Sequence, residues 1–443
     1  MQTSISGAAS IAPPGLNPLT HHDDGRVRVT PKIVAATVAG NALEFYDFLT
    51  YAFFAVFIGR TFFPTGNDFT SLLASVAVFG VGFVSRPLGG LLIGSYADRA
   101  GRKPAMILTI ALITVGTMGL ALTPSYESIG TAAPVIVVIC RLIQGLALGG
   151  EVGPSSAFLV EIAPPNRRAT YASWQIASQG LAALVAGAVG MVVASMLSPA
   201  QVQSWGWRIP FALGLLLIPI AIYLRRVMPE TLPGHDSGAP VASLWQNISE
   251  NGRVIALSVL VIMGGTVSTY VGTYMTTYAL TALKLPITVA LMATVVGGLT
   301  TFACALLGGW LADQYGRKVI MILPRLLLIA LMIPLFSWLV GAPAVNTLFV
   351  TTFILSALTA ISGAASFVAI PELLTAKARA TGLSIAYAIG VSLFGGTTQL
   401  LITWLINSTG NKMAPAYYVI FTSIITVIAM FALAETKDRQ LAK

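Results

Sequence analysis

The sequence predicts an all-α polytopic membrane protein with twelve transmembrane helices in two pseudo-symmetric halves of six. Of its 443 residues, 56% are hydrophobic and only 9% are charged, whereas soluble domains carry roughly 25% charged residues. Apolar runs of about 20 residues, the length that crosses roughly 30 Å of hydrocarbon, recur from Ile33 almost to the C-terminus. Helices must form these spans because lipid offers no hydrogen-bond partner to an open sheet edge.

A charged turn that occurs twice indicates the two halves. Leu92–Lys103 reads LIGSYADRAGRK, and Leu307–Lys318 reads LGGWLADQYGRK. A second pair of similar segments, Glu161–Thr170 and Glu372–Thr381, follows in the same order. Many secondary transporters are built from structural repeats, with the substrate site at the midplane between them. The order of the motifs therefore predicts two related halves around a central site.

Polar and Pro/Gly breaks divide the apolar sequence into the predicted helices. These cover residues 33–58, 71–96, 104–122, 134–158, 171–196, 207–224, 254–280, 288–312, 319–340, 346–370, 380–405 and 414–434. The predicted domains are a cytoplasmic tail (1–32), an N-terminal half (33–224), a cytoplasmic central loop (225–253), a C-terminal half (254–434) and a second cytoplasmic tail (435–443). No cleavable signal peptide is expected, because the first 30 residues contain no apolar core.

Basic residues gather in every even-numbered connection and in both tails, which predicts that both termini are cytoplasmic. They include Arg99, Arg102, Lys103, Arg167, Arg168, Arg225, Arg226, Arg253, Arg317, Lys318, Lys377 and Arg379. The opposite side has only Arg60, Lys284 and Lys412, with Arg208 near the interface. This placement accounts for the net charge of +9 without a nucleic-acid partner.

The sequence gives no indication of an enzyme, a metal site or a cofactor. Cys140 and Cys304 lie in apolar runs of opposite halves and have no metal-ligand spacing. The three histidines, His21, His22 and His235, fall in the predicted tail and central loop. A channel would not explain the repeated charged turns. We therefore expect no catalytic residues, no cofactor and no metal.

Six ionisable residues lie inside the predicted helices, where each costs at least about 2.5–3.5 kcal/mol at a helix centre. They are Glu44, Asp47, Arg86, Arg141, Glu151 and Arg325. Glu44 and Asp47 are three residues apart and share one helical face with Asn41. Two nearby carboxylates in low dielectric raise the proton affinity of at least one of them. The pair predicts a proton-coupling site; the alternative is a structural carboxylate held by hydrogen bonds.

Arg86 is the predicted ligand for a substrate carboxylate. It lies some ten residues from the charged turn, about 15 Å deep at 1.5 Å per residue, in a helix with no acid before that turn. Its planar guanidinium can bind a carboxylate through two hydrogen bonds. The alternative is neutralisation by Glu44, which would make Arg86 structural.

The other two arginines receive different interpretations. Arg141 shares a stripe with Gln144 and Glu151, and because it keeps its proton it needs a counter-charge. The role of Glu151 stays open, with a gate partner as one possibility. Arg325 begins the ninth helix, a turn or two from the cytoplasm, where it is expected to extend to the interface as a structural residue.

The predicted seventh helix is rich in hydroxyl groups. Its stripe of Tyr270, Thr273, Tyr274 and Thr277 can line an aqueous cavity and donate hydrogen bonds to an anion. Alternatively, these hydroxyls bond to their own helix backbone. Because the second half has no acid within its helices, we expect proton chemistry in the first half and neutral hydrogen bonding in the second. The predicted substrate-binding residues are Asn41, Arg86, Arg141, Gln144, Gln175, Gln179, Tyr270, Tyr274 and Tyr387.

The repeated turns and Arg141-Leu-Ile-Gln144-Gly145 resemble the major facilitator superfamily. Further motifs are similar to its metabolite:proton symporter family, which includes citrate, α-ketoglutarate, shikimate and proline/betaine carriers. These are Gly40-Asn-Ala-Leu-Glu-Phe-Tyr-Asp-Phe48, Ser85-Arg-Pro-Leu-Gly-Gly90 and Trp205-Gly-Trp-Arg-Ile-Pro210. Ser173–Gln179, Phe394–Gly396 and Thr409–Lys412 look most like the citrate and tricarboxylate branch.

The resemblance implies two functional groups. An acid of the first helix, Asp47 or Glu44, pairs with Arg141 and separates from it when a proton arrives; the alternative is a permanent ion pair. Opposite charges at the inner helix ends form a cytoplasmic gate that latches the halves; the alternative is that basic loops only fix the topology. The implied gate residues are Asp98, Arg99, Arg102, Glu161, Asp313, Arg317 and Glu372.

The expected function is proton-coupled symport by alternating access, importing a small organic anion such as citrate or a related di- or tricarboxylate. The alternative is a symporter of a zwitterionic osmolyte such as proline or betaine. A long C-terminal coiled coil would favour that alternative, and only eight residues follow Glu435. The expected partners are the solute, protons and the lipid bilayer, with a monomer in the bacterial inner membrane and no nucleic acid.

Overall fold

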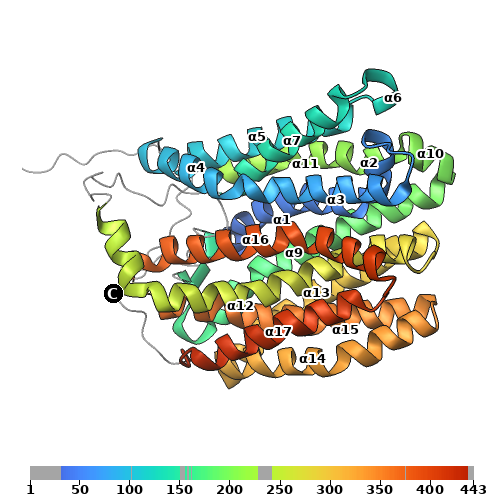
Figure 1. The fold of residues 1–443 in the computed structure, drawn as a ribbon. Helices are drawn as coiled ribbons and strands as arrows, with labels where there is room; N and C mark the ends of the chain where they lie inside the picture. The colour runs from blue at the N-terminus through green and yellow to red at the C-terminus, as the bar shows by residue number, and fades with distance from the viewer. Residues whose placement is uncertain are drawn as a thin grey trace, which may run out of the picture.

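Long helices run side by side along one direction and fall into two groups that follow the order of the chain (Figure 1). The computed structural model describes residues 31–100, 102–149, 155–156, 159–160, 162–227, 242–374 and 376–437. Most helices of the first group occupy the upper part of the view in Figure 1 and those of the second group the lower part, whereas α9 of the first group lies between α16 and α13 of the second. The two predicted tails lie largely outside the described residues, and so do residues 228–241 of the predicted central loop.

The first group contains the helices of the N-terminal half. They are α1 (Pro31–Phe53), α2 (Ala55–Phe62), α3 (Asp68–Val84), α4 (Arg86–Ala100), α5 (Arg102–Leu122), α6 (Tyr126–Ile129), α7 (Ala132–Gly149), the 3₁₀ turn η1 (Pro165–Arg167), α9 (Arg168–Met196), α10 (Pro199–Ser204), the 3₁₀ turn η2 (Gly206–Arg208) and α11 (Ile209–Val227). The second group contains α12 (Ala242–Thr281), α13 (Ile287–Tyr315), α14 (Arg317–Gly341), α15 (Val345–Leu373), α16 (Ala376–Thr409) and α17 (Ala414–Ala432).

These helices form twelve membrane segments, which confirms the predicted fold class. Nine spans within the described residues are long and apolar enough to cross a membrane alone. The pair α1 and α2, bent by 65°, makes a tenth. The shorter apolar stretch of α5 and the proline-containing α11 complete the two sets of six.

Two predicted boundaries differ from the structure. The first span is interrupted at Phe54, where the backbone leaves helical geometry, and it continues to Phe62. The seventh helix begins at Ala242, inside the predicted central loop, whereas its apolar span begins at Asn251. Apolar runs mark where a helix enters the membrane, and a helix can continue beyond that point with polar residues.

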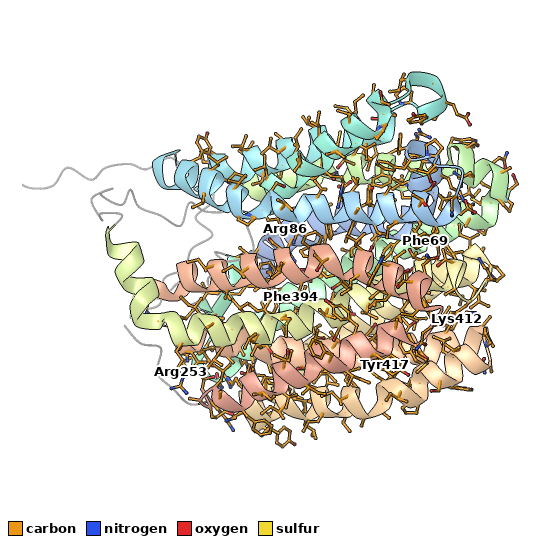
Figure 2. All side chains as sticks on the ribbon, in the orientation of Figure 1. Phe69, Arg86, Arg253, Phe394, Lys412 and Tyr417 are labelled. Carbon is orange, nitrogen blue, oxygen red and sulfur yellow. The ribbon has the colours of Figure 1, made fainter. Side chains whose placement is uncertain are left out.

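Figure 2 shows the ends of the bundle through its labelled side chains. Arg253 lies at one end and Lys412 at the other, with Arg86 between them. Arg253 belongs to the basic set that the sequence places on the cytoplasmic side, and Lys412 belongs to the opposite set. These two residues thus lie at opposite ends of the bundle, as the predicted topology requires of them.

Glycines allow the two halves to approach closely at two helix crossings. A Cβ atom added to Gly298 of α13 would lie 2.3 Å from the backbone N of Leu184 in α9. One added to Gly80 of α3 would lie 2.4 Å from the backbone O of Gly396 in α16. Small residues at such crossings bring helix backbones together in membranes. These crossings hold the two halves in direct backbone contact.

Candidate functional site

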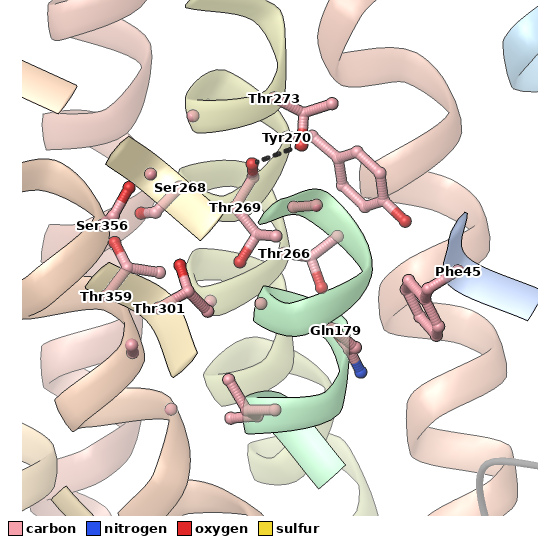
Figure 3. A pocket seen from close by; sticks show the side chains of 18 of the residues that line it. Phe45, Gln179, Thr266, Ser268, Thr269, Tyr270, Thr273, Thr301, Ser356 and Thr359 are labelled. Carbon is pink, nitrogen blue, oxygen red and sulfur yellow. Dashed lines mark hydrogen bonds between the residues drawn. The ribbon is translucent and has the colours of Figure 1, made fainter. Parts of the chain in front are cut away.

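A cavity of about 150 Å³ lies between the two halves (Figure 3). The N-terminal half contributes side chains of α1 and α9, including Phe45, Phe53 and Gln179. The C-terminal half supplies the rest from α12, α13, α14, α15 and α16. A cavity of similar size in another protein binds benzene, so this one accommodates a small organic molecule.

The cavity has a hydroxyl-rich side and an aromatic side. Figure 3 shows Ser268, Thr301 and Thr359 grouped on one side, next to Thr269 and Ser356. Phe45 and Tyr270 lie on the other side. In the described part of the chain, no carboxylate lines the cavity.

Arg325 lines this cavity, and its predicted position at the membrane interface is wrong. The residue is 1% exposed, and its Nη1 donates hydrogen bonds to Gly264 O (3.2 Å) and Ser268 Oγ (2.8 Å) of α12. The sequence pattern already contains the reason, because Met321, Arg325 and Leu328 share the buried face of α14. The expectation that the second half offers only neutral hydrogen bonding is wrong as well.

The residues predicted to bind substrate divide into three groups. Gln179, Tyr270 and Tyr387 line the cavity. Tyr274 lies in a buried apolar cluster, where it accepts a hydrogen bond from Thr403 (2.9 Å). The third group comprises Asn41, Gln175, Gln144, Arg86 and Arg141, none of which lines the cavity.

Asn41 and Gln175 connect α1 to α9. The Asn41 amide donates to Ser178 Oγ (2.7 Å) and to Gln175 O (3.2 Å). The Gln175 amide donates back to Asn41 Oδ1 (3.2 Å). Reciprocal bonds of this kind fix two helices of the same half, so these amides act as structural links in this conformation.

Aromatic rings pack against both Arg86 and Arg141, and neither arginine lines the cavity. The Arg86 guanidinium lies 4.0 Å from the ring centroid of Phe83 and 4.8 Å from that of Phe48. The Arg141 guanidinium lies 5.0 Å from the same Phe48 ring. Tyr270, which lines the cavity, packs edge-on against Phe48 and Phe83. No ion pair joins Arg86 to Glu44 within the described residues, so the predicted alternative of neutralisation by Glu44 is not observed.

Asp47 reaches Arg141 through Gln144. The Gln144 amide donates to Asp47 Oδ2 (2.6 Å), and its carbonyl oxygen accepts from Arg141 Nη1 (2.7 Å). Among the described residues no direct ion pair joins Asp47 to Arg141. Asp47 and Arg141, the predicted acid and base, therefore lie close together and are bridged by the Gln144 amide. The sequence predicts Gln144 as a substrate-binding residue.

A second, smaller cavity of about 30 Å³ touches both carboxylates of α1. Glu44, Asp47 and Thr117 are among its lining residues, together with side chains of α5 and α11. Both acids are buried, at 4% and 5% exposure. The volume is enough for about one or two water molecules. The acids therefore line a small space that is distinct from the central cavity and otherwise mostly apolar.

Three predicted gate residues meet at the predicted cytoplasmic end. Arg317 Nε and Nη2 each donate to Glu372 at 3.1 Å, and Nη2 lies 3.5 Å from Asp313 Oδ1. Two further residues take part in this cluster, although neither was among the predicted gate residues. Arg168 of the other half lies 3.7 Å from Glu372, and Thr436 Oγ1 donates to it at 2.6 Å. The side chains of Asp98, Arg99, Arg102 and Glu161, and the residue Glu151, lie outside the described part of the chain.

Asp313 joins the two halves directly. Its carboxylate, on α13, accepts hydrogen bonds from Ala169 N (3.0 Å), Thr170 N (2.9 Å) and Thr170 Oγ1 (2.8 Å) at the start of α9. The first N–H groups of a helix have no intrahelical partner, and an acid there is favoured by the helix dipole. Asp313 is thus an N-terminal cap that one half supplies to the other.

Glu435 forms a similar cap within the C-terminal half. Its carboxylate accepts from Arg317 N (3.0 Å) and Lys318 N (2.9 Å), where α14 begins after Gly316. Burial acts to raise the pKa of Glu435, but hydrogen bonds from four backbone N–H groups outweigh it and lower that pKa below its usual value. The segment after α17 is thereby held across the start of α14.

Two helical halves around a central cavity, with charged links at one end, define a secondary membrane transporter. The chain belongs to the sugar (and other) transporter family, which it matches over residues 32–233 and 234–443. This result confirms the resemblance to the major facilitator superfamily, and the chain is a multi-pass transporter, not an enzyme.

Similar proteins support the same assignment. The citrate-proton symporter of Klebsiella pneumoniae is 35% identical over 399 residues, which cover 89% of this chain and 90% of that protein. The proline/betaine transporter of Escherichia coli is 30% identical, over 97% of this chain and 88% of that protein. The solved xylose transporter XylE of E. coli, partially occluded and inward-open, has a TM-score of 0.73 at 18% identity and covers 93% of this chain and 99% of its own. That structural likeness concerns the fold alone.

Proposed function

We propose that the protein is a proton-coupled symporter that imports a small organic anion, citrate or a related di- or tricarboxylate, by alternating access. The observation that carries this proposal is the buried cation Arg325 in a cavity with hydroxyl groups on one side and no described carboxylate. Such a site favours an anion over a cation. The 35% identity to a citrate-proton symporter supports the same solute class.

The proton site in this proposal is the chain Asp47–Gln144–Arg141, with Glu44 beside it. An ionised Asp47 accepts a short, charge-assisted bond from Gln144. Protonation removes that charge and weakens the connection to Arg141. Because the residues of this chain do not line the central cavity, the proton acts on the solute through a change in helix packing, without direct contact.

The links at Asp313 and Glu372 form the gate of the proposed transport cycle. Both acids of the C-terminal half contact the start of α9 in the N-terminal half. Opening this end requires those contacts to break, whereas opening the opposite end leaves them intact. We place this gate on the cytoplasmic side of the bacterial inner membrane, with both termini cytoplasmic and the protein a monomer.

Uptake into proteoliposomes tests the proposed function. Under an inwardly directed proton gradient, radiolabelled citrate or 2-oxoglutarate should accumulate, saturate with concentration, and fall to background when a protonophore is added. Accumulation that a protonophore leaves unchanged would exclude proton coupling. Transport of neither acid would exclude the proposed solute class.

A zwitterionic osmolyte is the second candidate solute. The aromatic side of the cavity, with Phe45 and Tyr270, supports it, because quaternary ammonium groups bind aromatic faces. Only one described cation lines the cavity. A single arginine matches the one carboxylate of a zwitterion better than the three carboxylates of citrate. Radiolabelled proline and betaine therefore belong in the same uptake experiment, and uptake of these alone would favour the second candidate.

A further inference from the structure

Arg325 is a buried cation with no counter-charge among the described residues. Within the described residues no ion pair involves it, although it is 1% exposed. A guanidinium cannot lose its proton in a protein, and a buried charge is retained only where it is paired or serves a purpose. We therefore expect an anion to pair with the Arg325 guanidinium, and the described part of the protein does not supply one.

The guanidinium retains unused hydrogen-bonding capacity. Both bonds to α12 are made by Nη1, and Nε has no partner within the described residues. The structure also records no bond to Nη2 there. A carboxylate binds such a planar fork through two parallel hydrogen bonds.

Hydroxyl groups of α15 complete the same side of the cavity. Thr352 and Thr359 both line it, and neither hydroxyl has a partner within the described residues. Figure 3 shows Thr359 and Ser356 close to Ser268, the residue that accepts from Arg325. A cation and unsatisfied donors thus face one small space.

We propose that Arg325, Thr352 and Thr359 form an anion subsite that takes one carboxylate of the transported solute. This inference rests on the proposed function and deepens it, since it assigns solute recognition to α14 and α15 of the C-terminal half. An organic acid and a zwitterion both carry the required carboxylate. The competing explanation is structural, with Arg325 serving only to tie α14 to α12 through Gly264 and Ser268.

Solute exchange in proteoliposomes without a proton gradient tests the subsite, because exchange reports solute binding apart from proton coupling. The probes are radiolabelled citrate, 2-oxoglutarate, proline and betaine, each with the full-length protein. For the solute that the unmodified protein exchanges, Arg325→Gln should raise the half-saturating concentration about 10- to 100-fold. Arg325→Lys should give a smaller increase, because it keeps the charge and loses the fork.

Matched variants separate binding from packing. Thr359→Val should raise the half-saturating concentration several-fold, whereas Thr351→Val should not, because the Thr351 hydroxyl is also buried and without a partner among the described residues but does not line the cavity. Arg60→Gln removes an exposed arginine and should match the unmodified protein. A purely structural Arg325 would lower the maximal rate and leave half-saturation unchanged.

The outcomes distinguish this inference from the proposed function. Exchange of none of the four solutes by the unmodified protein would remove both. Exchange with an unchanged half-saturating concentration in Arg325→Gln would remove the subsite alone. If Arg325→Gln does not fold, Arg325→Lys and Thr359→Val decide, and unchanged half-saturation in both would overturn the subsite. Which solutes exchange tells an organic acid from a zwitterion.

Discussion

Removal of the Asp313 carboxylate should shift the protein toward conformations that are open at the predicted cytoplasmic end. The carboxylate supplies three hydrogen bonds to the start of α9 across the two halves. Loss of a helix N-cap costs about 0.5–2 kcal/mol, and a negative charge at a helix start contributes about 0.3–1 kcal/mol. Together these favour the closed end by about 2 kcal/mol, which corresponds to a shift of about 30-fold in the equilibrium.

Two substitutions of Asp313 separate the contribution of its hydrogen bonds from that of its negative charge. Asp313→Ala removes every acceptor and should produce the full shift. Asp313→Asn keeps one acceptor oxygen and loses the charge, so its shift should be about half as large in free energy. In the open conformation water can hydrate the α9 start, so the loss applies to the closed conformation alone.

Spin labels at Asn166 and Tyr315 can measure the shift. Both positions are exposed, and they lie on opposite sides of the contact that Asp313 makes. Pulsed distance measurements should show a longer-distance population that grows from the unmodified protein to Asp313→Asn and then to Asp313→Ala. Asp68→Asn, in an exposed ion pair with Arg60, is the matched control and should change nothing. Identical distance distributions in all four proteins would refute the reasoning.

Three further predictions concern the proton site, the C-terminal cap and the glycine crossings. Asp47→Asn should abolish gradient-driven accumulation, which in the unmodified protein reaches about tenfold per coupled proton for one pH unit, and should retain exchange; accumulation by the variant would count against Asp47. The lowered pKa of Glu435 contributes stability that is present above its usual value of 4.5 and is lost as the pH falls through the folded pKa. Thermal unfolding of Glu435→Gln in detergent should therefore depend less on acid pH than that of the unmodified protein, and equal acid dependence would contradict this role. Gly298→Ala should lower the unfolding temperature because its Cβ meets the α9 backbone, whereas Gly252→Ala, with nothing within 4 Å, should leave it unchanged or raise it; equal effects would show that the crossing tolerates a side chain.

The fold was predictable because its signals are local and repeated. Apolar length determines a membrane span without reference to neighbouring helices, and the turn at Asp98 recurs at Asp313. The ends of spans were less predictable. The bend at Phe54 lies within an unbroken apolar run, and the polar start of α12 carries no apolar signal.

The sequence predicts which charged residues of the candidate site are buried, but it does not predict which of them line the cavity. The sequence identifies buried charges, but it does not say which way each helix is rotated about its axis. Arg86 and Arg141 therefore looked like cavity residues, although the Phe48 ring covers both. The distance of Arg325 from the start of its helix predicts a position at the membrane interface, which is wrong. Its spacing from Met321 and Leu328 was the better guide, because that spacing reports the buried face.

The glycine crossings bear on how easily the halves can move past each other. At Gly80–Gly396 and at Gly180–Gly298 the helices touch through backbone atoms. Side chains that interlock must leave their positions before two surfaces can rotate, and each such step adds a barrier. At the glycine pairs themselves no side chain stands between the helices, which favours pivoting there, whereas neighbouring side chains such as Phe83, which packs against Gly396, must repack. Glycine pairs of this kind offer no interlocking side chains that would favour one conformation over another, whereas the contacts of Asp313 and Glu372 with the start of α9 exist only while that end of the bundle is closed.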